Sequence, residues 1–394
     1  MALRNAPLAL DEDQVLWFRA RRLHLAPPGA LDAAAAARAA LGVQSQQIGP
    51  SLLGLSQRTK GRPTAAALER ELFEAPRSLV RTWGQRDTLH VYDPATDWAA
   101  VVAARQLWAA GGRRGAMPAE AAVDKARAVL LAAEVPISRK DVAHLVSAKV
   151  LREIEIVVGA GPVALGHAAG RLIWRLAQRG EACMAARVGS AQAYAARTHW
   201  FPGLAWPAVL DPLLAAVEHT RRYLAGYGPA TAADLAHFFG AHARAARQWL
   251  EVLEKAGALL PVACGARKGL FALQADRKAL AAAPPTSATA WPLRLLPMWD
   301  GYLMGNADKS WTVADAADGK RVWRKAAVVA AVALWRGRAV ANWSHSVKGK
   351  RLRVQVEPLS GWRQSKHAAG LRREAKAVAA HLGLEGAEVA IDSG

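Results

Sequence analysis

Two stretches, PATAADLAH at residues 229–237 and PISRKDVAH at residues 136–144, repeat one pattern and decide the fold prediction. In the first, the hydroxyl residue Thr231 precedes a helix-forming run and Asp234 follows three residues later; the second has serine and aspartate at the same places. Such a hydroxyl accepts a hydrogen bond from a free amide of the first helical turn, and the carboxylate complements the helix dipole. The chain therefore contains two copies of one helix start.

The sequence after residue 229 predicts a winged helix. A short helix ends at Gly240, and an amphipathic helix is expected over Arg244–Ala256. Two strands, Leu259–Val262 and Leu270–Leu273, flank a basic tip at residues 265–269. Two helices joined by a tight turn and followed by a hairpin are typical of this motif.

The other copy predicts the same order, and a third, less regular copy lies upstream. The copy at residue 136 gives helices near Arg139–Ser147 and Val163–Gly180 and strands near Ala182–Val188 and Gln192–Arg197. The upstream copy gives helices near Ala33–Leu41 and Gln44–Arg58 and strands near Leu79–Trp83 and Thr88–Tyr92. Helix-turn-helix elements also serve as scaffolding, so the repeats alone do not establish DNA binding.

Beyond residue 280 the composition changes. Ala281–Ala290 is rich in Pro, Ala, Ser and Thr and predicts a linker. The runs Ala326–Leu334, Arg338–Trp343 and Arg351–Glu357 predict a small antiparallel sheet or barrel, and a helix is expected near Arg363–Leu382.

The predicted fold class is mainly α with β hairpins (α+β): tandem winged-helix units plus a C-terminal small β-barrel or sheet. We expect four domains: 1–130, an N-terminal winged-helix region; 131–205 and 206–280, the second and third winged helices; and 291–394, a β-rich domain with a closing helix.

The charge of the chain points to a polyanionic partner. Lys and Arg number 52 against 32 Asp and Glu among 394 residues, a formal net charge of +20. Nucleic acid or an anionic membrane would satisfy this charge. The basic residues are spread through segments that look folded instead of forming one exposed run, which favours nucleic acid. A GC-rich source genome would explain the preference for Arg and Ala but not the imbalance of sign.

The first residues, 1–13, lack the charged and apolar segments of a secretion signal, and the longest apolar runs are too short to span a membrane. We expect a cytoplasmic, nucleoid-associated bacterial protein without membrane contact. The two cysteines, Cys183 and Cys264, have no CxxC or His pair nearby, so we predict small apolar side chains beside strands, with no disulfide and no metal site.

A possible nucleotide-binding motif occurs mid-chain. The apolar run Ile154–Val158 precedes Gly159–Ala164, whose order matches a GxGxxA fingerprint. No further alternation of strands and helices follows to build a doubly wound sheet. We therefore favour a flexible turn with Pro162 at the first helical position, and expect no cofactor.

Glutamines at residues 44–47 are the most informative polar cluster. Gln44, Gln46 and Gln47 stand at a predicted helix start. Amides are neither useful bases nor nucleophiles, but two of them can orient a water and present carbonyl dipoles to a developing cation. An exposed polar first turn is the alternative interpretation.

Several motifs in order resemble the AlkZ/YcaQ-type DNA glycosylases. Gln44-Ser45-Gln46 is similar to the Q-x-Q catalytic signature of the AlkZ-like branch; the YcaQ-like branch is expected to carry Asp at its second position. Three further stretches resemble family segments and extend the likeness over about residues 10–345: Arg81–His90 (RTWGQRDTLH), Arg222–Thr231 (RYLAGYGPAT) and Leu295–Gly305 (LLPMWDGYLMG). Two departures are Ser45, where the family usually has an apolar residue, and Asp87, where it commonly has glycine.

The resemblance implies a monofunctional glycosylase that starts base-excision repair of alkylated purines. Alkylation at N7 or N3 makes the purine a cationic leaving group, so the enzyme's task is electrostatic. Gln44 and Gln46 would hold the attacking water at the sugar, without strand cleavage. The winged-helix units would form a basic channel around double-stranded DNA, and a bulky lesion need not be fully flipped out.

Further site residues are proposed with less direct support. His90 is placed at the site by resemblance, with a hydrogen-bonded core histidine as the alternative, and His199 is suggested as a residue lining the lesion pocket. Candidates for phosphate contacts are the arginines Arg58, Arg81, Arg86, Arg187 and Arg197.

A winged-helix transcriptional regulator is the alternative from another functional class. It would share the charge and the repeats, but would dimerise on palindromic sites with base-specific contacts. For the enzyme we expect a monomer that binds duplex DNA with little sequence preference. The sequence leaves open whether its lesions are methylpurines, bulky monoadducts or interstrand cross-links.

Overall fold

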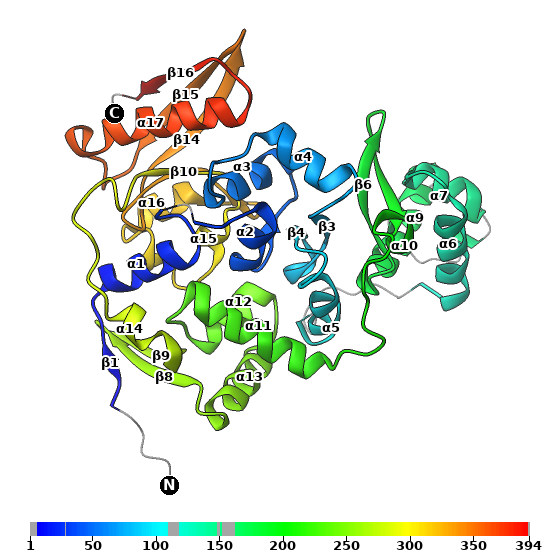
Figure 1. Cartoon of the computed structure of the whole chain (residues 1–394), viewed down its shortest axis with the longest axis horizontal. Helices are drawn as coiled ribbons and strands as arrows, with labels where there is room; N and C mark the ends of the chain where they lie inside the picture. The colour runs from blue at the N-terminus through cyan, green and yellow to red at the C-terminus, as the bar shows by residue number, and fades with distance from the viewer. Residues whose placement is uncertain (1–5, 28, 109–117, 148–149, 152–161, 393–394) are drawn as a thin grey trace.

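The computed structural model describes residues 6–27, 29–108, 118–147, 150–151 and 162–392. It confirms the α+β class: the chain has three winged-helix units and a C-terminal sheet, and the first unit lies between the other parts (Figure 1). Each unit has one order of elements, namely a first helix, a short strand or bridge, two further helices and a two-stranded hairpin.

Unit 3 matches its prediction closely. Thr231 caps α12, since its Oγ1 accepts from the Asp234 amide at 3.2 Å while the Asp234 carboxylate accepts from the Thr231 amide at 2.8 Å. A bridge between Ala230 and Phe271 adds a third strand to the hairpin. Its elements are α11 (Pro212–Tyr227), α12 (Ala232–Phe239), α13 (Ala243–Lys255), β8 (Leu259–Cys264) and β9 (Arg267–Leu273).

Unit 2 repeats this arrangement and begins earlier than predicted. Ser138 and Asp141 form the same reciprocal cap on α7. Val123 and Leu130 of α6 share a core with Leu172 of α9, so the expected boundary at residues 130/131 cuts through the unit. Residues 152–161, which hold most of the GxGxxA-like stretch interpreted as a flexible turn, lie outside the described residues. The elements of the unit are α6 (Glu120–Ala132), β5 (Ile137–Ser138), α7 (Arg139–Val146), α9 (Pro162–Gln178), β6 (Ala182–Val188) and β7 (Ala191–Ala196).

Unit 1 differs from its prediction at the glutamine cluster. The helix expected from Gln44 begins only at Ile48, because Val43 and Gln44 form a short strand. The second helix of its helix-turn-helix is α4, which the sequence interpretation did not include. The elements of the unit are α2 (Ala33–Ala39), β2 (Val43–Gln44), α3 (Ile48–Arg58), α4 (Ala65–Phe73), β3 (Val80–Trp83), the 3-10 turn η1 (Gln85–Asp87) and β4 (Leu89–Tyr92).

Units 1 and 2 share one six-stranded sheet, in the order β2-β4-β3-β6-β7-β5. The junction is the antiparallel pairing of Arg81 in β3 with Met184 in β6. The hairpin of unit 2 is therefore held beside that of unit 1 and projects outward from the centre (Figure 1).

The N-terminal segment packs on unit 3. β1 (Leu8–Ala9) pairs in parallel with β8, and α1 (Glu12–Arg22) buries Leu16 and Phe18 in a core that includes Leu260. Helix α5 (Trp98–Trp108) leads from unit 1 and packs against α11. The expected domain 1–130 thus combines parts of three structural regions.

The C-terminal region is an open sheet in the order β10-β13-β14-β15-β16 and not a closed barrel. Helix α17 (Gln364–His381) packs on this sheet, and a strand that was not predicted follows it and pairs in parallel with β15. The strands are β10 (Arg294–Leu296), β13 (Val332–Trp335), β14 (Arg338–Lys348), β15 (Arg351–Pro358) and β16 (Gly386–Ile391). The small remaining elements of the chain are α10 (Arg197–Trp200), η2 (Gln274–Asp276), α14 (Arg277–Leu280), α15 (Gly301–Met304), η3 (Lys309–Trp311), α16 (Ala316–Val322), β11 (Trp323–Arg324) and β12 (Val328–Val329).

Both cysteines are buried free thiols in strands, Cys183 in β6 and Cys264 in β8, as predicted. None of the helices in the described ranges has the length and apolar character needed to cross a lipid bilayer.

The two repeated caps should contribute differently to the stability of the protein. Asp234→Ala removes a cap and also the acceptor of the Ala307 amide, which bonds to Asp234 at 2.7 Å. Asp141→Ala removes only a cap, worth about 1 kcal/mol. Leaving the Ala307 amide unpaired adds about 1 to 3 kcal/mol to the Asp234→Ala loss. Urea unfolding of both variants measures the difference, and equal losses would mean that the bond to Ala307 contributes nothing to stability.

Candidate active site

The glutamine signature lies in the strand-to-helix turn of unit 1. In units 2 and 3 the helix begins directly after the strand or bridge, with Ser138 or Thr231 as its cap. In unit 1, residues 45–47 intervene between β2 and α3, and Gln47 at the cap position makes no side-chain capping bond. The turn is therefore longer than its counterparts, and its polar side chains are not used to cap the helix.

Gln44 is half-buried and held at both its backbone and its side chain. Its strand pairs with β4, opposite His90. Its Oε1 accepts from Arg86 Nη2 at 3.0 Å, and the other guanidinium nitrogen, Nη1, donates to the carbonyl of Phe238 at the end of α12. Unit 3 thus helps to fix the orientation of a side chain of unit 1.

Gln46 is exposed, and its amide is also oriented. Its Oε1 accepts from the backbone amide of Leu89 at 2.8 Å, while the Leu89 carbonyl accepts from the Ser45 amide at 2.6 Å. Because both partners of the two glutamines are pure donors, the contacting atoms must be oxygens. Within the described part of the chain neither Nε2 has a hydrogen bond, so each amide offers two donors and a second oxygen lone pair to a ligand.

Ser45, the departure from the family pattern, points away from the turn into a polar network. It is fully buried, and its Oγ lies 3.0 Å from the hydroxyl of Ser51 and 3.1 Å from Arg81 Nε. Arg81 also donates to the Ser45 carbonyl and, through Nη1, to Gln192 of β7 at 3.0 Å. The hydroxyl is therefore satisfied, and the signature is tied to both hairpins.

The turn is electropositive. Among the described residues, neither Arg81 nor Arg86 is ion paired with a carboxylate; their partners are carbonyl and amide oxygens. Burial lowers the pKa of each to about 10, so both remain charged at neutral pH. Two cations without a counter-charge therefore flank the two glutamines.

Tyr92 fixes the backbone that enters the signature. Its ring occupies the space where a Cβ of Gly42 or Gly84 would lie, and Gly42 has φ +88°. The Tyr92 hydroxyl donates to Gln85 Oε1, and Gln85 Nε2 donates to the Leu41 carbonyl at 2.9 Å. Glycine is required at residue 42 for both its backbone conformation and its lack of a side chain.

The hairpin turn that presents Arg86 is strained. Arg86 and Asp87 have φ +56° and +54°, in the left-handed region. The second departure from the family pattern, Asp87 in place of glycine, falls at one of these positions, and aspartate tolerates this conformation better than most residues. The Asp87 carboxylate also accepts from Arg105, which compensates for part of the strain.

Three of the residues predicted to contact DNA are buried, so the prediction of direct contact is wrong for these three. His90 is 1% exposed; its Nδ1 donates to the Thr88 carbonyl at 3.0 Å, and burial lowers its pKa to about 3. It is a neutral core histidine beneath Gln44. Arg58 is also 1% exposed and forms a two-bond ion pair with Asp300, at 2.7 and 2.9 Å. Arg81 is 7% exposed and supports Ser45.

The remaining predicted residues divide along the unit 2 hairpin. Arg187 is exposed near its tip and close enough to Arg81 to lower the pKa of that arginine, after burial. Arg197 and the exposed His199 lie at the opposite end of β7, where Arg197 donates to the Gly180 carbonyl and stacks on Trp206. Arg86 contacts the signature, whereas Arg187 lies near the hairpin tip and Arg197 and His199 lie at the opposite end of the hairpin.

Lys309 and His237 are site neighbours that the sequence interpretation missed. Lys309 Nζ lies 3.2 Å from His237 Nε2, and His237 precedes Phe238, the partner of Arg86. His237 belongs to a stretch whose helix cap the sequence predicts, whereas Lys309 lies outside the predicted motifs. Nothing in the local pattern links either residue to residue 44, because the contacts join distant segments.

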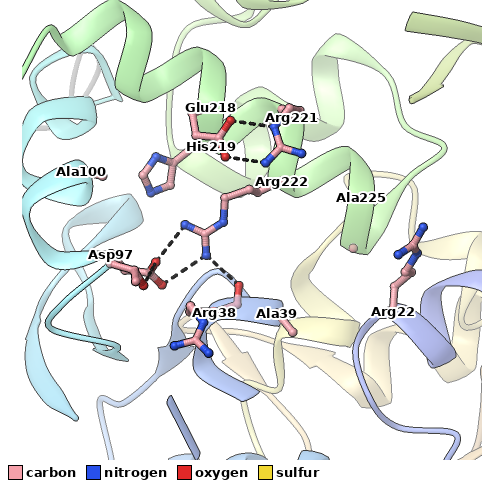
Figure 2. Close-up of a pocket in the computed structure, with 12 residues that line it drawn as sticks. Arg22, Arg38, Ala39, Asp97, Ala100, Glu218, His219, Arg221, Arg222 and Ala225 are labelled. Carbon is pink, nitrogen blue, oxygen red and sulfur yellow. Dashed lines mark hydrogen bonds and ion pairs between the residues drawn. The ribbon is translucent and has the colours of Figure 1, made fainter. Parts of the chain in front are cut away.

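A cleft between α11, α5 and α2, of about 520 Å³, is lined by four arginines but is not electropositive (Figure 2). Each arginine is ion paired: Arg22 with Asp276, Arg38 with Asp93, Arg221 with Glu218 and Arg222 with Asp97. Arg222, from the family-like RYLAGYGPAT stretch, therefore joins units 1 and 3 instead of contacting a ligand.

A second, apolar cavity of about 350 Å³ adjoins the signature turn. Gln47 and Pro50 line one side, and Trp343 and His345 of β14 line another. His345 stacks on Trp343 with 5.5 Å between ring centroids, and burial lowers its pKa, which favours the neutral ring. No Arg or Lys is among the residues that line this cavity. The described residues contain no group of His, Cys, Asp and Glu side chains arranged to hold a metal ion.

Comparisons with known proteins show what the chain is similar to. A family model described as "DNA glycosylase AlkZ-like" matches residues 37–381. The Interstrand DNA cross-link repair glycosylase of Streptomyces sahachiroi is 26% identical over 339 residues, which cover 84% of this chain and 86% of that protein. The solved structure of the Streptomyces sahachiroi DNA glycosylase AlkZ superposes with a TM-score of 0.80 at 23% identity, covering 98% of this chain and 100% of that one.

The role of Tyr92 predicts a contrast between two glycines. Gly42→Ala should lose at least about 3 kcal/mol of stability, because left-handed strain of about 1 kcal/mol adds to an overlap with the Tyr92 ring. Gly61 also has a positive φ, +79°, but nothing lies within 4 Å of a Cβ there. Gly61→Ala should therefore lose only the strain, about 1 kcal/mol. Urea unfolding measures both losses of stability. Similar losses in the two variants would mean that the Tyr92 ring does not restrict residue 42.

Proposed function

The chain belongs to the AlkZ-like family of DNA glycosylases, and from this premise we propose that it hydrolyses the N-glycosidic bond of alkylated, cationic purines in double-stranded DNA. Gln44 and Gln46 are the proposed catalytic residues. The observation that carries this assignment is a pair of oriented side-chain amides, with free donors and lone pairs, in a turn flanked by Arg81 and Arg86.

The chemistry fits a site without a carboxylate. A purine alkylated at N7 or N3 leaves as a neutral base, so no acid has to protonate it. Positive charge develops on the sugar, and the transition state is stabilised by oriented dipoles and a positioned water. The second lone pair of each Oε1 and the Nε2 donors can hold that water, while the contacts from Arg86 and Leu89 prevent the amides from rotating.

The family assignment decides between the two functional classes raised by the sequence, in favour of the enzyme over the transcriptional regulator. We further propose that the protein acts as a cytoplasmic monomer on nucleoid DNA, with exposed Arg187 and half-buried Arg86 as phosphate contacts. Its net charge of +20 supports association with the duplex irrespective of sequence.

We also propose that bulky adducts lie within its substrate range. The Streptomyces sahachiroi relative is named for repair of interstrand cross-links. The apolar cavity beside Gln47 falls within the size range of pockets for small aromatic groups. Because Trp343 and the neutral His345 line it without any Arg or Lys, an aromatic or cationic adduct would meet no like charge there.

The central test uses duplex DNA containing N7-methylguanine. Gln44→Ala and Gln46→Ala should each lower the single-turnover rate of base release by at least about 100-fold, as removal of one positioned transition-state group commonly does. Gln47→Ala is the matched control, because Gln47 has no capping bond, and should retain release within about 3-fold. Abasic sites are revealed by mild alkali. Unchanged release in both test variants would reject these roles.

Hydrolysis without strand cleavage predicts a second result. The wild-type protein should leave an abasic strand that breaks only after alkali, and borohydride should trap no covalent protein–DNA adduct. Lys309 is the amine to monitor by mass spectrometry, since burial lowers its pKa to about 8 and it lies near Arg86. An adduct on Lys309 would contradict the monofunctional assignment.

The cavity predicts a lesion-dependent effect. Ala331→Phe, which fills the cavity from its wall, should slow release of a purine bearing a bulky aromatic adduct by about 10-fold or more, the cost of about 1.4 kcal/mol of lost contact. Release of N7-methylguanine by the same variant should not change, which serves as the internal control. Equal effects on both lesions would exclude the cavity as the adduct site.

A further inference from the structure

Lys309 is a half-buried cation with only neutral partners at hydrogen-bond distance. Its Nζ donates to the carbonyls of Asn306 and Leu303, at 2.6 and 3.4 Å, and lies 3.2 Å from His237 Nε2. Burial, and after it repulsion from Arg86, lower its pKa to about 8. Burial of the His237 ring on α12, and after it repulsion from Lys309, lowers the pKa of His237 to about 4.

This pair is contiguous with the signature. His237 and Phe238 are neighbours on α12, and Arg86 bridges the Phe238 carbonyl and Gln44 Oε1. The helix end also abuts the strained turn, since a Cβ at Gly240 would lie 3.1 Å from the Arg86 backbone. Lys309 therefore adds a second cation near Arg86, and the neutral His237 ring lies next to it.

The acids near Lys309 are committed elsewhere. Asp234 of α12 accepts from the amides of Thr231 and Ala307. Asp308, next to Lys309 in the chain, pairs with Arg267 and with Ser310. Both favour the charged form of Lys309 only through space, and neither forms a hydrogen bond to its ammonium group among the described contacts.

Uncompensated cations beside Gln44 oppose the proposed reaction, because the sugar itself becomes positive in the transition state. A phosphate of the substrate would remove this penalty and supply the negatively charged acceptor that Arg86 and Lys309 lack. A phosphodiester carries one negative charge and oxygens suited to Arg and Lys.

We propose that Lys309 and His237, together with Arg86, bind the DNA phosphate adjacent to the damaged nucleotide, so that the substrate completes the charge balance of the active site. The inference rests on the proposed function for the position of the nucleotide. Lys309 and His237 act as binding residues that fix the strand relative to Gln44 and Gln46.

The first test measures binding to a duplex with a tetrahydrofuran abasic analogue, by fluorescence anisotropy at several salt concentrations. Lys309→Met should weaken binding by about 10-fold and lower the slope of log K against log salt by about 1, as loss of one phosphate contact does. Lys309→Arg, which keeps the charge, should restore both. Lys376→Met, at an exposed lysine of α17, is the matched control and should leave both unchanged.

The second test locates the phosphate. Uncharged methylphosphonate replaces each phosphate near the analogue in turn. One position adjacent to the lesion should weaken wild-type binding strongly and Lys309→Met binding hardly at all, because the two changes remove the same contact. Additive losses at every position, or wild-type affinity and salt slope in Lys309→Met, would overturn the proposal.

The third readout is pH. The groups facing Lys309 are His237 and Asp234 from α12, Arg86 from η1 and Asp308 from its own loop. Phosphate favours the charged ammonium, so binding raises the pKa of Lys309 from about 8, and wild-type affinity should fall as pH rises above that value. Lys309→Arg should show a flatter profile, and identical profiles would count against the site.

Different results would reject the proposed function and the proposed phosphate site. Absence of N7-methylguanine release by the wild-type protein would reject the proposed function, whereas the methylphosphonate scan requires no catalysis. A positive scan with no base release would keep the phosphate site, and base release without a position-specific effect would remove it.

Discussion

The short pairing of β2 with β4 is the constraint on which the site depends. Two residues, Val43 and Gln44, attach the signature to the edge of the shared sheet, and the Tyr92 ring, packed against Gly42 and Gly84, sets the path by which the chain reaches them. Residues 45–47 after this strand form an extended turn before α3. The two sister units use the equivalent positions for helix caps, whereas unit 1 leaves its glutamines available to a ligand.

Charge is distributed in two distinct ways. Around the signature, Arg81, Arg86 and Lys309 have only neutral partners among the described contacts, and burial lowers the pKa of each. In the cleft of Figure 2, by contrast, every arginine is matched by a carboxylate. Buried cations without a counter-charge cost stability. Their clustering at one place therefore favours a ligand that supplies the negative charge. In a protein of net charge +20, the position of the unpaired cations is thus more informative than their number.

Local sequence patterns predicted the features that depend on local physics. The caps at Ser138 and Thr231, the helix end at Gly240 and the apolar face of α13 follow from residue types at fixed spacing. Contacts between distant segments could not be predicted in this way: the junction of Arg81 with Met184, the parallel pairing of β1 with β8, and the burial of Arg58 against Asp300. An arginine of a DNA-binding protein has the same local pattern whether it meets a phosphate or a buried aspartate, which is why Arg58 was assigned wrongly. The signature itself was found through family resemblance, because glutamine carries no strong chemical signal of its own.

In the proposed mechanism, two oriented amides stabilise a cationic sugar once a DNA phosphate has neutralised Arg86 beside them. The most direct measurement compares binding of two duplexes that differ only at the lesion, one with a cationic pyrrolidine sugar analogue and one with its neutral tetrahydrofuran counterpart. The wild-type protein should bind the cationic analogue more tightly, by about 10-fold or more as expected of a transition-state mimic, and the Gln44→Ala, Gln46→Ala double variant should lose this preference. Equal binding of the two duplexes by the wild-type protein would contradict the account.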